Sequence, residues 1–214
     1  MSGARPDRFR NRQEAGELLA AELVRRGITG HVLVLALPRG GVPVGHEVAR
    51  VLKAPLDTLV ARKIGAPGNR EYGVGALAPG DVLILDEAAL RSLGISQEAL
   101  DPIIAEEMEE MARRMARYAS GTYSENLPAD TVIIVDDGVA TGVTAMAAIE
   151  SVKLLRKPRR LIFAAPICAR DTARKLREWA EVICLREADN MRAVGEWYEE
   201  FEPVSDEEVL QYLS

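Results

Sequence analysis

An acidic doublet at the end of an apolar run is the feature of this sequence best suited to chemistry. Asp136 and Asp137 directly follow the run Val132–Val135. Carboxylates accept hydrogen bonds and do not donate them, so they suit neighbouring hydroxyl groups better than a second anion. An acidic helix cap would explain one aspartate but not two. The doublet therefore predicts a binding site for a vicinal diol, such as two ring hydroxyls of a sugar.

The residues after the doublet form a glycine- and threonine-rich turn that opens a predicted helix. Glycines let the backbone turn tightly and point successive N–H groups inward, and threonine hydroxyls add donors at the helix N-terminus. We expect this turn to bind a phosphate monoester. The residues concerned are Gly138, Val139, Ala140, Thr141, Gly142 and Thr144.

Two further segments combine glycine with positive charge. The sequence PRGG at 38–41 follows an apolar run at 32–37, and its glycines allow the backbone to approach a ligand closely. Arg62 and Lys63 open a charged segment at 62–72 that carries Pro67-Gly68-Asn69 and is predicted to be a mobile loop.

Together these segments resemble the type I phosphoribosyltransferases, which transfer a ribosyl phosphate from phosphoribosyl pyrophosphate to a nucleophile. The resemblance is strongest over residues 132–144. It implies that residues 38–41 form the pyrophosphate loop, with Arg39 and Gly40 beside the leaving group and a cis peptide after Pro38. It also implies that Arg62 and Lys63 belong to a flexible loop that closes over the pyrophosphate.

The resemblance implies a magnesium-dependent transfer of the 5-phosphoribosyl group to a nitrogenous base or related acceptor, of the salvage type. The implied catalytic residues are Asp136, Asp137, Arg39 and Lys63. Magnesium would bridge substrate oxygens, and no residue is assigned as its ligand. Enzymes acting on 6-oxopurines carry an aspartate where this chain has Ala140, which disfavours hypoxanthine and guanine. A homodimer is also implied.

The alternative is a regulatory protein that binds phosphoribosyl pyrophosphate without turnover, and the sequence discriminates poorly between the two. A P-loop nucleotidase is not supported, since G-x-x-x-x-G-K-[ST] does not occur. Residues 73–78 match G-x-G-x-x-A formally, but Pro79-Gly80 would break the helix that this motif should open.

Composition argues against several other partners. The net charge of −6 repels a phosphate polymer, and ten aromatic residues are few for stacking bases, so we expect no nucleic acid partner. No run approaches the ~20 apolar residues of a membrane span, which favours a cytoplasmic protein. Cys168 and Cys184 lack the spacing of a zinc site, and we expect both to be reduced.

The chemistry-bearing residues must be positioned by an α/β fold, a parallel sheet flanked by helices with a small C-terminal hood. Apolar runs alternating with helical patterns favour such a sheet, in which ligands lie at the carboxyl ends of the strands. The strands are expected at 32–37, 56–61, 82–85, 132–135, 161–165 and 182–185, and the helices at 11–26, 42–52, 97–119, 141–155 and 171–179.

We expect a single domain over residues 1–214. Its N-terminal helix falls within 1–30, and residues 186–214 form a hood over the acceptor. The hood aromatics Trp197, Tyr198 and Phe201 either stack on a ring or pack the tail down, and packing is favoured. A stripe of methionines in the helix at 97–119 is expected to lie in the core.

Overall fold

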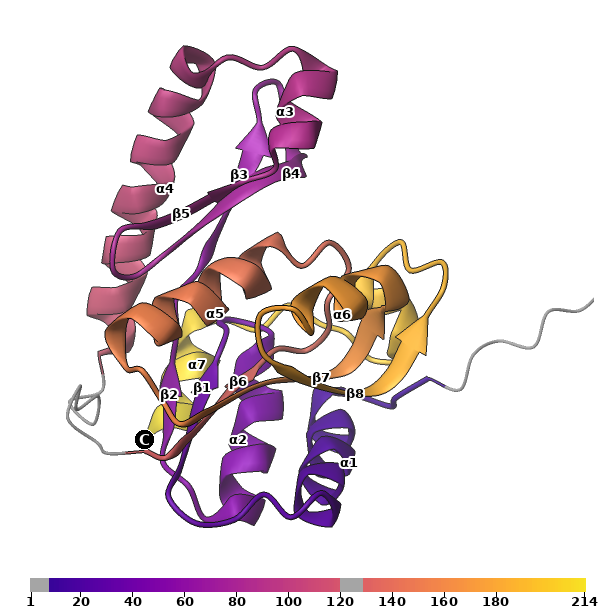
Figure 1. Ribbon diagram of the computed structural model, residues 1–214. Helices are drawn as coiled ribbons and strands as arrows, with labels where there is room; N and C mark the ends of the chain where they lie inside the picture. Colours follow the sequence, from indigo (N-terminus) through magenta and orange to yellow (C-terminus); the bar gives the residue numbers. More distant parts are fainter. Residues whose placement is uncertain (1–7, 120–128) are drawn as a thin grey trace, which may run out of the picture.

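The computed structural model describes residues 8–119 and 129–214, and in these residues the chain forms two sheets (Figure 1). All strands of the larger sheet are parallel. In spatial order they are β2 (Leu56–Thr58), β1 (Val32–Ala36), β6 (Thr131–Val135), β7 (Arg160–Ala169) and β8 (Glu181–Ala188). The predicted α/β class is confirmed.

Helices cover both faces of the larger sheet, which explains why its strands are apolar throughout rather than alternating. On one face, Leu19 and Leu23 of α1 (Arg12–Arg25) and Val48 of α2 (Gly41–Leu52) pack on the sheet. The other face is covered by α5 (Val143–Leu155) and α6 (Arg170–Leu176). The buried strand residues on both sides form the main core of the described chain.

The second sheet is antiparallel and was not predicted, although the expected strand at 82–85 is one of its strands rather than part of the parallel sheet. It consists of β3 (Arg62–Ala66), β4 (Asn69–Ala78) and β5 (Val82–Leu85), and it packs against α3 (Glu87–Leu93) and α4 (Gln97–Tyr118). The segment 62–72, predicted to be a mobile loop, is thus largely a strand hairpin. Its stability comes from Ile64 and Val74, which are fully buried, and the surrounding charges and glycines hid this apolar face in the sequence.

Helix α5 lies between the two sheets. Its Ala148 and Ile149 belong to the core of the larger sheet, while Val143 and Ala147 pack against β4 and β5. In addition, the Ser151 hydroxyl donates to the Pro79 carbonyl at 2.7 Å. Helix α5 therefore packs against both sheets.

The methionine stripe of α4 is only partly buried, contrary to expectation. Leu100, Ile103 and Tyr118 are buried, whereas Met108 and Met115 are 46% and 42% exposed. Of the methionines in this helix, Met111 packs against the apolar clusters of the described chain, and Met108 and Met115 belong to none of these clusters.

The start of the described chain lies beside the segment at 197–201, which precedes the last helix. The N–H of Phe9 donates to the Trp197 carbonyl and that of Glu199 donates to the Phe9 carbonyl. Tyr198 is 2% exposed and packs between Phe9 and Phe201, with ring centroids 5.5 and 5.0 Å away. The packing favoured for the hood aromatics is therefore observed for Tyr198. The tail continues through η1 (Val194–Trp197) to α7 (Asp206–Leu213).

The expectation of two reduced cysteines is wrong in this structure. Cys168 on β7 and Cys184 on β8 are joined in a disulfide, with their Cα atoms 6.3 Å apart. Their separation of sixteen residues did not show that the fold places them on adjacent strands.

None of the helices in the described ranges is both long and apolar enough to cross a membrane.

Asp57 on the edge strand β2 allows a test of how the edge of the larger sheet is buried. It is 6% exposed, and burial raises its pKa to about 6, although the Thr58 N–H and the charge of Arg156 act in the opposite direction. Because the folded pKa exceeds the ordinary value near 4, the native state binds the proton more tightly than the unfolded chain. Stability associated with this group is therefore lost as the pH rises through 6.

We predict that Asp57→Asn becomes more stable relative to the wild type between pH 4 and pH 7.5. The expected gain is up to about 3 kcal/mol, because asparagine stays neutral and its oxygen still accepts from Thr58. Urea unfolding of both proteins at the two pH values measures this change. An equal difference at both pH values would show that Asp57 titrates normally.

Candidate functional site

The candidate site lies where the strand order of the larger sheet reverses. From β1 the chain crosses to β2 on one side, whereas β6, β7 and β8 follow on the other. In open parallel sheets, ligands bind at the carboxyl ends of the strands at such a point. The two segments that leave this point are the PRGG loop after β1 and the acidic turn after β6.

The PRGG loop and the acidic doublet are in direct contact. A Cβ at Gly40 would lie 2.1 Å from Asp137 Oδ2, and one at Gly41 would lie 2.7 Å from the Val135 carbonyl oxygen. Both positions therefore require glycine. The peptide between Pro38 and Arg39 is cis, as expected from the resemblance.

The turn after the doublet is held by its neighbours on β7 and α6. The Val139 N–H donates to the Ile167 carbonyl at 2.9 Å, and the Val139 carbonyl accepts from the Ala169 N–H at 2.8 Å. The Thr172 hydroxyl donates to the Ala140 carbonyl at 2.5 Å. These bonds fix the backbone of the turn independently of any ligand.

The turn ends at a helix N-terminus that is open to an anion. Gly142 has φ +81°, a conformation that favours glycine, and it caps α5 without a side-chain hydrogen bond. The first turn of α5 has no acidic residue, and α2 likewise begins at Gly41 without a side-chain cap or an acidic first turn. The N–H groups at such ends lack intrahelical partners and attract anions. At α2, however, the Gly41 and Val42 N–H groups already donate to the Leu37 and Arg39 carbonyls. Thr141 is exposed and Thr144 is partly exposed beside this end of α5.

The two carboxyl groups of the doublet differ in environment. Burial raises the pKa of Asp136 well above its ordinary value, and the neighbouring Asp137 charge raises it further. Burial also raises the pKa of Asp137, but the Arg12 guanidinium opposes this effect. The pKa of Asp137 is therefore raised less than that of Asp136, and Asp136 is the first of the two to be protonated as the pH falls.

Sequence reasoning missed two residues that contact Asp137. The Arg12 Nε lies 2.8 Å from Asp137 Oδ2, and the Tyr198 hydroxyl donates to the Asp137 carbonyl at 2.6 Å. Both residues lie more than 60 positions away in the chain. The only available signal was a cluster of four arginines in the first twelve residues, which says nothing about partners.

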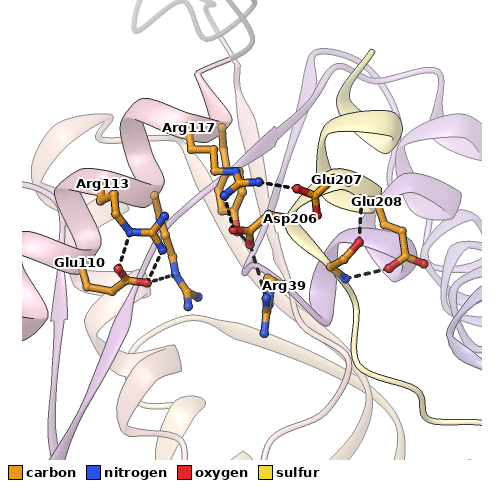
Figure 2. A network of polar contacts seen from close by, with 10 residues as sticks. Arg39, Glu110, Arg113, Arg117, Asp206, Glu207 and Glu208 are labelled. Atoms are coloured by element: carbon orange, nitrogen blue, oxygen red, sulfur yellow. Dashed lines mark hydrogen bonds and ion pairs between the residues drawn. The ribbon is translucent and has the colours of Figure 1, made fainter.

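Arg39 lies at the rim of the site and is anchored by the C-terminal helix (Figure 2). Its Nη1 is 3.5 Å from Asp206 Oδ1, and its side chain is 40% exposed. Asp206 also pairs with Arg117 at 3.0 Å and accepts from the Tyr118 hydroxyl at 2.6 Å. The Tyr118 hydrogen bond and the neighbouring arginines lower the pKa of Asp206, so it remains a carboxylate.

Arg62 and Lys63 lie on β3, where the structure pairs them with other residues. Arg62 Nη2 is 2.6 Å from Glu107 Oε2 on α4, in a largely buried pair. Lys63 donates to the Glu71 carbonyl at 3.1 Å and lies 3.7 Å from its carboxylate, which is fully exposed. Exposed pairs of this kind contribute little, typically about 0–1 kcal/mol. Lys63 is therefore the more easily released of the two cations.

Comparison with known proteins decides the family. A family model described as "Phosphoribosyl transferase domain" matches residues 9–201. The chain belongs to this family. The match covers both the PRGG loop and the acidic turn, and the fold expected from the resemblance to type I phosphoribosyltransferases is confirmed.

Individual relatives agree with this assignment. A protein of Mycobacterium tuberculosis (strain H37Rv) that is provisionally named a phosphoribosyl transferase is 38% identical over 207 residues, which cover 96% of this chain. Those residues are 46% of the relative, so this phosphoribosyl transferase domain spans about half of its length.

Solved structures share the fold. The crystal structure of TT1426 from Thermus thermophilus is 40% identical with a TM-score of 0.74, covering 96% of this chain and 97% of that one. The structure of AQ2163 from Aquifex aeolicus has a TM-score of 0.53 at 12% identity, covering 86% and 78%, and shows the fold alone.

Gly142 allows a test of the turn. A Cβ there would lie 2.4 Å from Thr172 Cγ2, whereas one at Gly27, which also has positive φ, would meet nothing within 4 Å. We predict that Gly142→Ala weakens binding of ribose 5-phosphate by about tenfold, the loss of one backbone hydrogen bond to a charged group. Gly27→Ala introduces similar backbone strain without changing affinity. Calorimetric titration of both variants measures the difference, and equal affinities would exclude the turn from the site.

Proposed function

We propose that this domain transfers the 5-phosphoribosyl group from phosphoribosyl pyrophosphate to a nitrogenous base or related acceptor and releases pyrophosphate. The observation that carries the proposal is the contact of the Gly40 backbone with Asp137. This contact joins a loop suited to the leaving group and a turn suited to the sugar phosphate. Family membership supports the same reaction class.

The 5-phosphate is assigned to the N-terminus of α5. The Val139 N–H already donates to the Ile167 carbonyl, so the phosphate is assigned to the N–H groups from Ala140 to Thr144, on a turn that β7 and α6 hold in place. An anion entering such a preformed turn requires little reorganisation, and the helix dipole favours it.

The ribose hydroxyls are assigned to the acidic doublet. Asp137 is 8% exposed and is the second of the pair to be protonated, so it accepts a hydrogen bond from a sugar hydroxyl in a site largely shielded from water. Asp136, which takes the first proton, lies beside it with its Oδ1 bonded to the Asp137 N–H at 2.9 Å. Holding both the phosphate and the diol fixes the position of the ribose ring.

The pyrophosphate is assigned to the PRGG loop and the start of α2. Arg39 supplies a partly exposed cation there, and Gly40 and Gly41 let the backbone approach closely. We propose that Lys63 exchanges Glu71 for the pyrophosphate, whereas Arg62 stays with Glu107 unless the hairpin moves. Positive charge near the leaving group stabilises the negative charge that develops on it.

Departure of pyrophosphate leaves an oxocarbenium-like ribose, so the role of the protein is positioning and charge stabilisation rather than covalent catalysis. Fixing both ends of the sugar aligns its anomeric carbon with an incoming acceptor. The negative charge of Asp137, bonded to the ring hydroxyls, also favours the developing positive charge.

We propose that a magnesium ion enters the site with the substrate. In the described residues no group of three histidine, cysteine or acidic side chains is arranged to hold a metal. Magnesium typically keeps several waters and binds substrate phosphates with few protein ligands. When bound, it would neutralise charge on the pyrophosphate.

The acceptor is left open as a nitrogenous base or related nucleophile. At the position of Ala140 there is no acid that could assist proton transfer to a 6-oxopurine, and its carbonyl is engaged by Thr172. We therefore propose that hypoxanthine and guanine are poor acceptors.

The homodimer expected from the resemblance stays a prediction, which sedimentation velocity would test.

The activity is tested by incubating the full chain with magnesium, phosphoribosyl pyrophosphate and a panel of bases. We predict pyrophosphate release that depends on the acceptor, with adenine, orotate and other bases exceeding hypoxanthine and guanine. Tight binding of phosphoribosyl pyrophosphate without release across the panel would contradict the transferase and indicate a regulatory binding protein.

Arg39→Ala separates the pyrophosphate subsite from the sugar subsite. We predict that the affinity for pyrophosphate falls about 10- to 100-fold, the range for one hydrogen bond to a charged group, while that for ribose 5-phosphate changes less than about threefold. Arg91→Ala on α3 is the control, because its side chain is 72% exposed and pairs only locally with Glu87. Equal losses for both ligands would argue against this role of Arg39.

A further inference from the structure

Arg12 and Asp137 form a buried ion pair between the first residue of α1 and the acidic doublet. The two side chains are 11% and 12% exposed, and the Arg12 Nε lies 2.8 Å from Asp137 Oδ2. Most other ion pairs in the described chain include at least one side chain that is more than a third exposed. The Arg12–Asp137 pair is buried on both sides, and one of its members belongs to the candidate site.

The Arg12 guanidinium is held in one orientation by the C-terminal segment. Its carbon lies 3.8 Å from the centre of the Phe201 ring, and its Nη1 donates to the Glu202 carbonyl at 2.8 Å. A guanidinium stacked on a ring and bonded along its edge has little rotational freedom.

The segment that holds Arg12 is itself tied to the doublet. The Tyr198 ring is stacked with Phe201, and its hydroxyl donates to the Asp137 carbonyl at 2.6 Å. The Glu200 N–H donates to the Arg10 carbonyl at 2.9 Å, which joins this segment to the start of α1. The backbone and the side chain of Asp137 are therefore both held by residues that lie outside the acidic turn.

The ion pair leaves Asp137 able to accept further hydrogen bonds. A carboxylate has about four lone-pair positions, and Arg12 contacts only Oδ2. The Gly40 backbone closely approaches the same oxygen, Oδ2, which restricts the movement of the carboxylate. Buried ion pairs are on average weak contributors to stability, so positioning is the better account of this one.

We propose that Arg12 is a positioning residue that fixes the Asp137 carboxylate as the hydrogen-bond acceptor for the ribose hydroxyls. The inference rests on the proposed function, since it concerns how the same site recognises the hydroxyl groups of the sugar. The groups that face the Asp137 side chain are Arg12, Asp136 and the Gly40 backbone, and Tyr198 faces its carbonyl.

The readout is the preference for ribose 5-phosphate over 2-deoxyribose 5-phosphate, because these ligands differ in one hydroxyl of the diol. We predict that the wild type prefers ribose 5-phosphate by about tenfold, the value of one hydrogen bond to a charged acceptor. In Arg12→Gln the preference falls below about twofold, since the carboxylate loses its charge partner and its orientation. A merely structural role would lower both affinities together.

The control is Arg10→Gln, which removes the same charge two residues away. The Arg10 side chain is 64% exposed and lies 3.7 Å from Glu14, so the tenfold preference is expected to persist. Arg12→Lys keeps the charge but loses the stacking on Phe201, and we predict an intermediate preference of about fourfold. Phe201→Leu is expected to lower the preference in the same direction.

Calorimetric titration of the four variants with both sugar phosphates carries out the test. An unchanged preference in Arg12→Lys and Phe201→Leu overturns the role of Arg12, even if Arg12→Gln does not fold. If the wild type itself shows no preference between the two sugars, the assignment of the diol to the doublet fails, and the proposed function fails with it. Loss of preference in the Arg12 variants with a normal Arg10→Gln supports the inference.

Discussion

The close approach of the Gly40 backbone to the Asp137 carboxylate is the constraint on which the rest of the site depends. A Cβ at position 40 would lie 2.1 Å from Asp137 Oδ2, so any other residue would force the two segments apart. The contact brings together two helix N-termini, those of α2 and α5, with the Asp137 side chain between them. A ligand with anionic groups at both ends and hydroxyl groups between them, such as the phosphoribosyl pyrophosphate proposed here, would complement all three.

The remainder of the fold fixes the positions of the PRGG loop and the acidic turn relative to each other. Parallel pairing of β1 with β6 sets their carboxyl ends side by side, and the part of β7 that extends past β6 bonds the turn through Val139. Helix α5 packs against both sheets, which restricts the position of its N-terminus. Arg12, near the start of the described chain, pairs with the Asp137 side chain, and Tyr198, in the C-terminal segment, bonds to the Asp137 carbonyl. The site is thus assembled from contacts that are distant in sequence.

This distance explains what the sequence could predict. The strands β1, β6, β7 and β8 were found because burial on both faces makes them apolar throughout, a local signal. The acidic turn was found because its chemistry is contiguous. The antiparallel sheet was missed because glycines and charges interrupt the apolar face formed by Ile64 and Val74, and Arg12 was missed because its partner lies 125 positions away. The Cys168–Cys184 disulfide depends on strand order in the same way.

A crystal structure of the protein with ribose 5-phosphate tests the central claim most directly. The account predicts the phosphate within hydrogen-bond distance of the backbone N–H groups between Ala140 and Thr144, and the 2- and 3-hydroxyls against the Asp136–Asp137 doublet. Ligand bound elsewhere, or a turn left empty at saturating concentration, would contradict it.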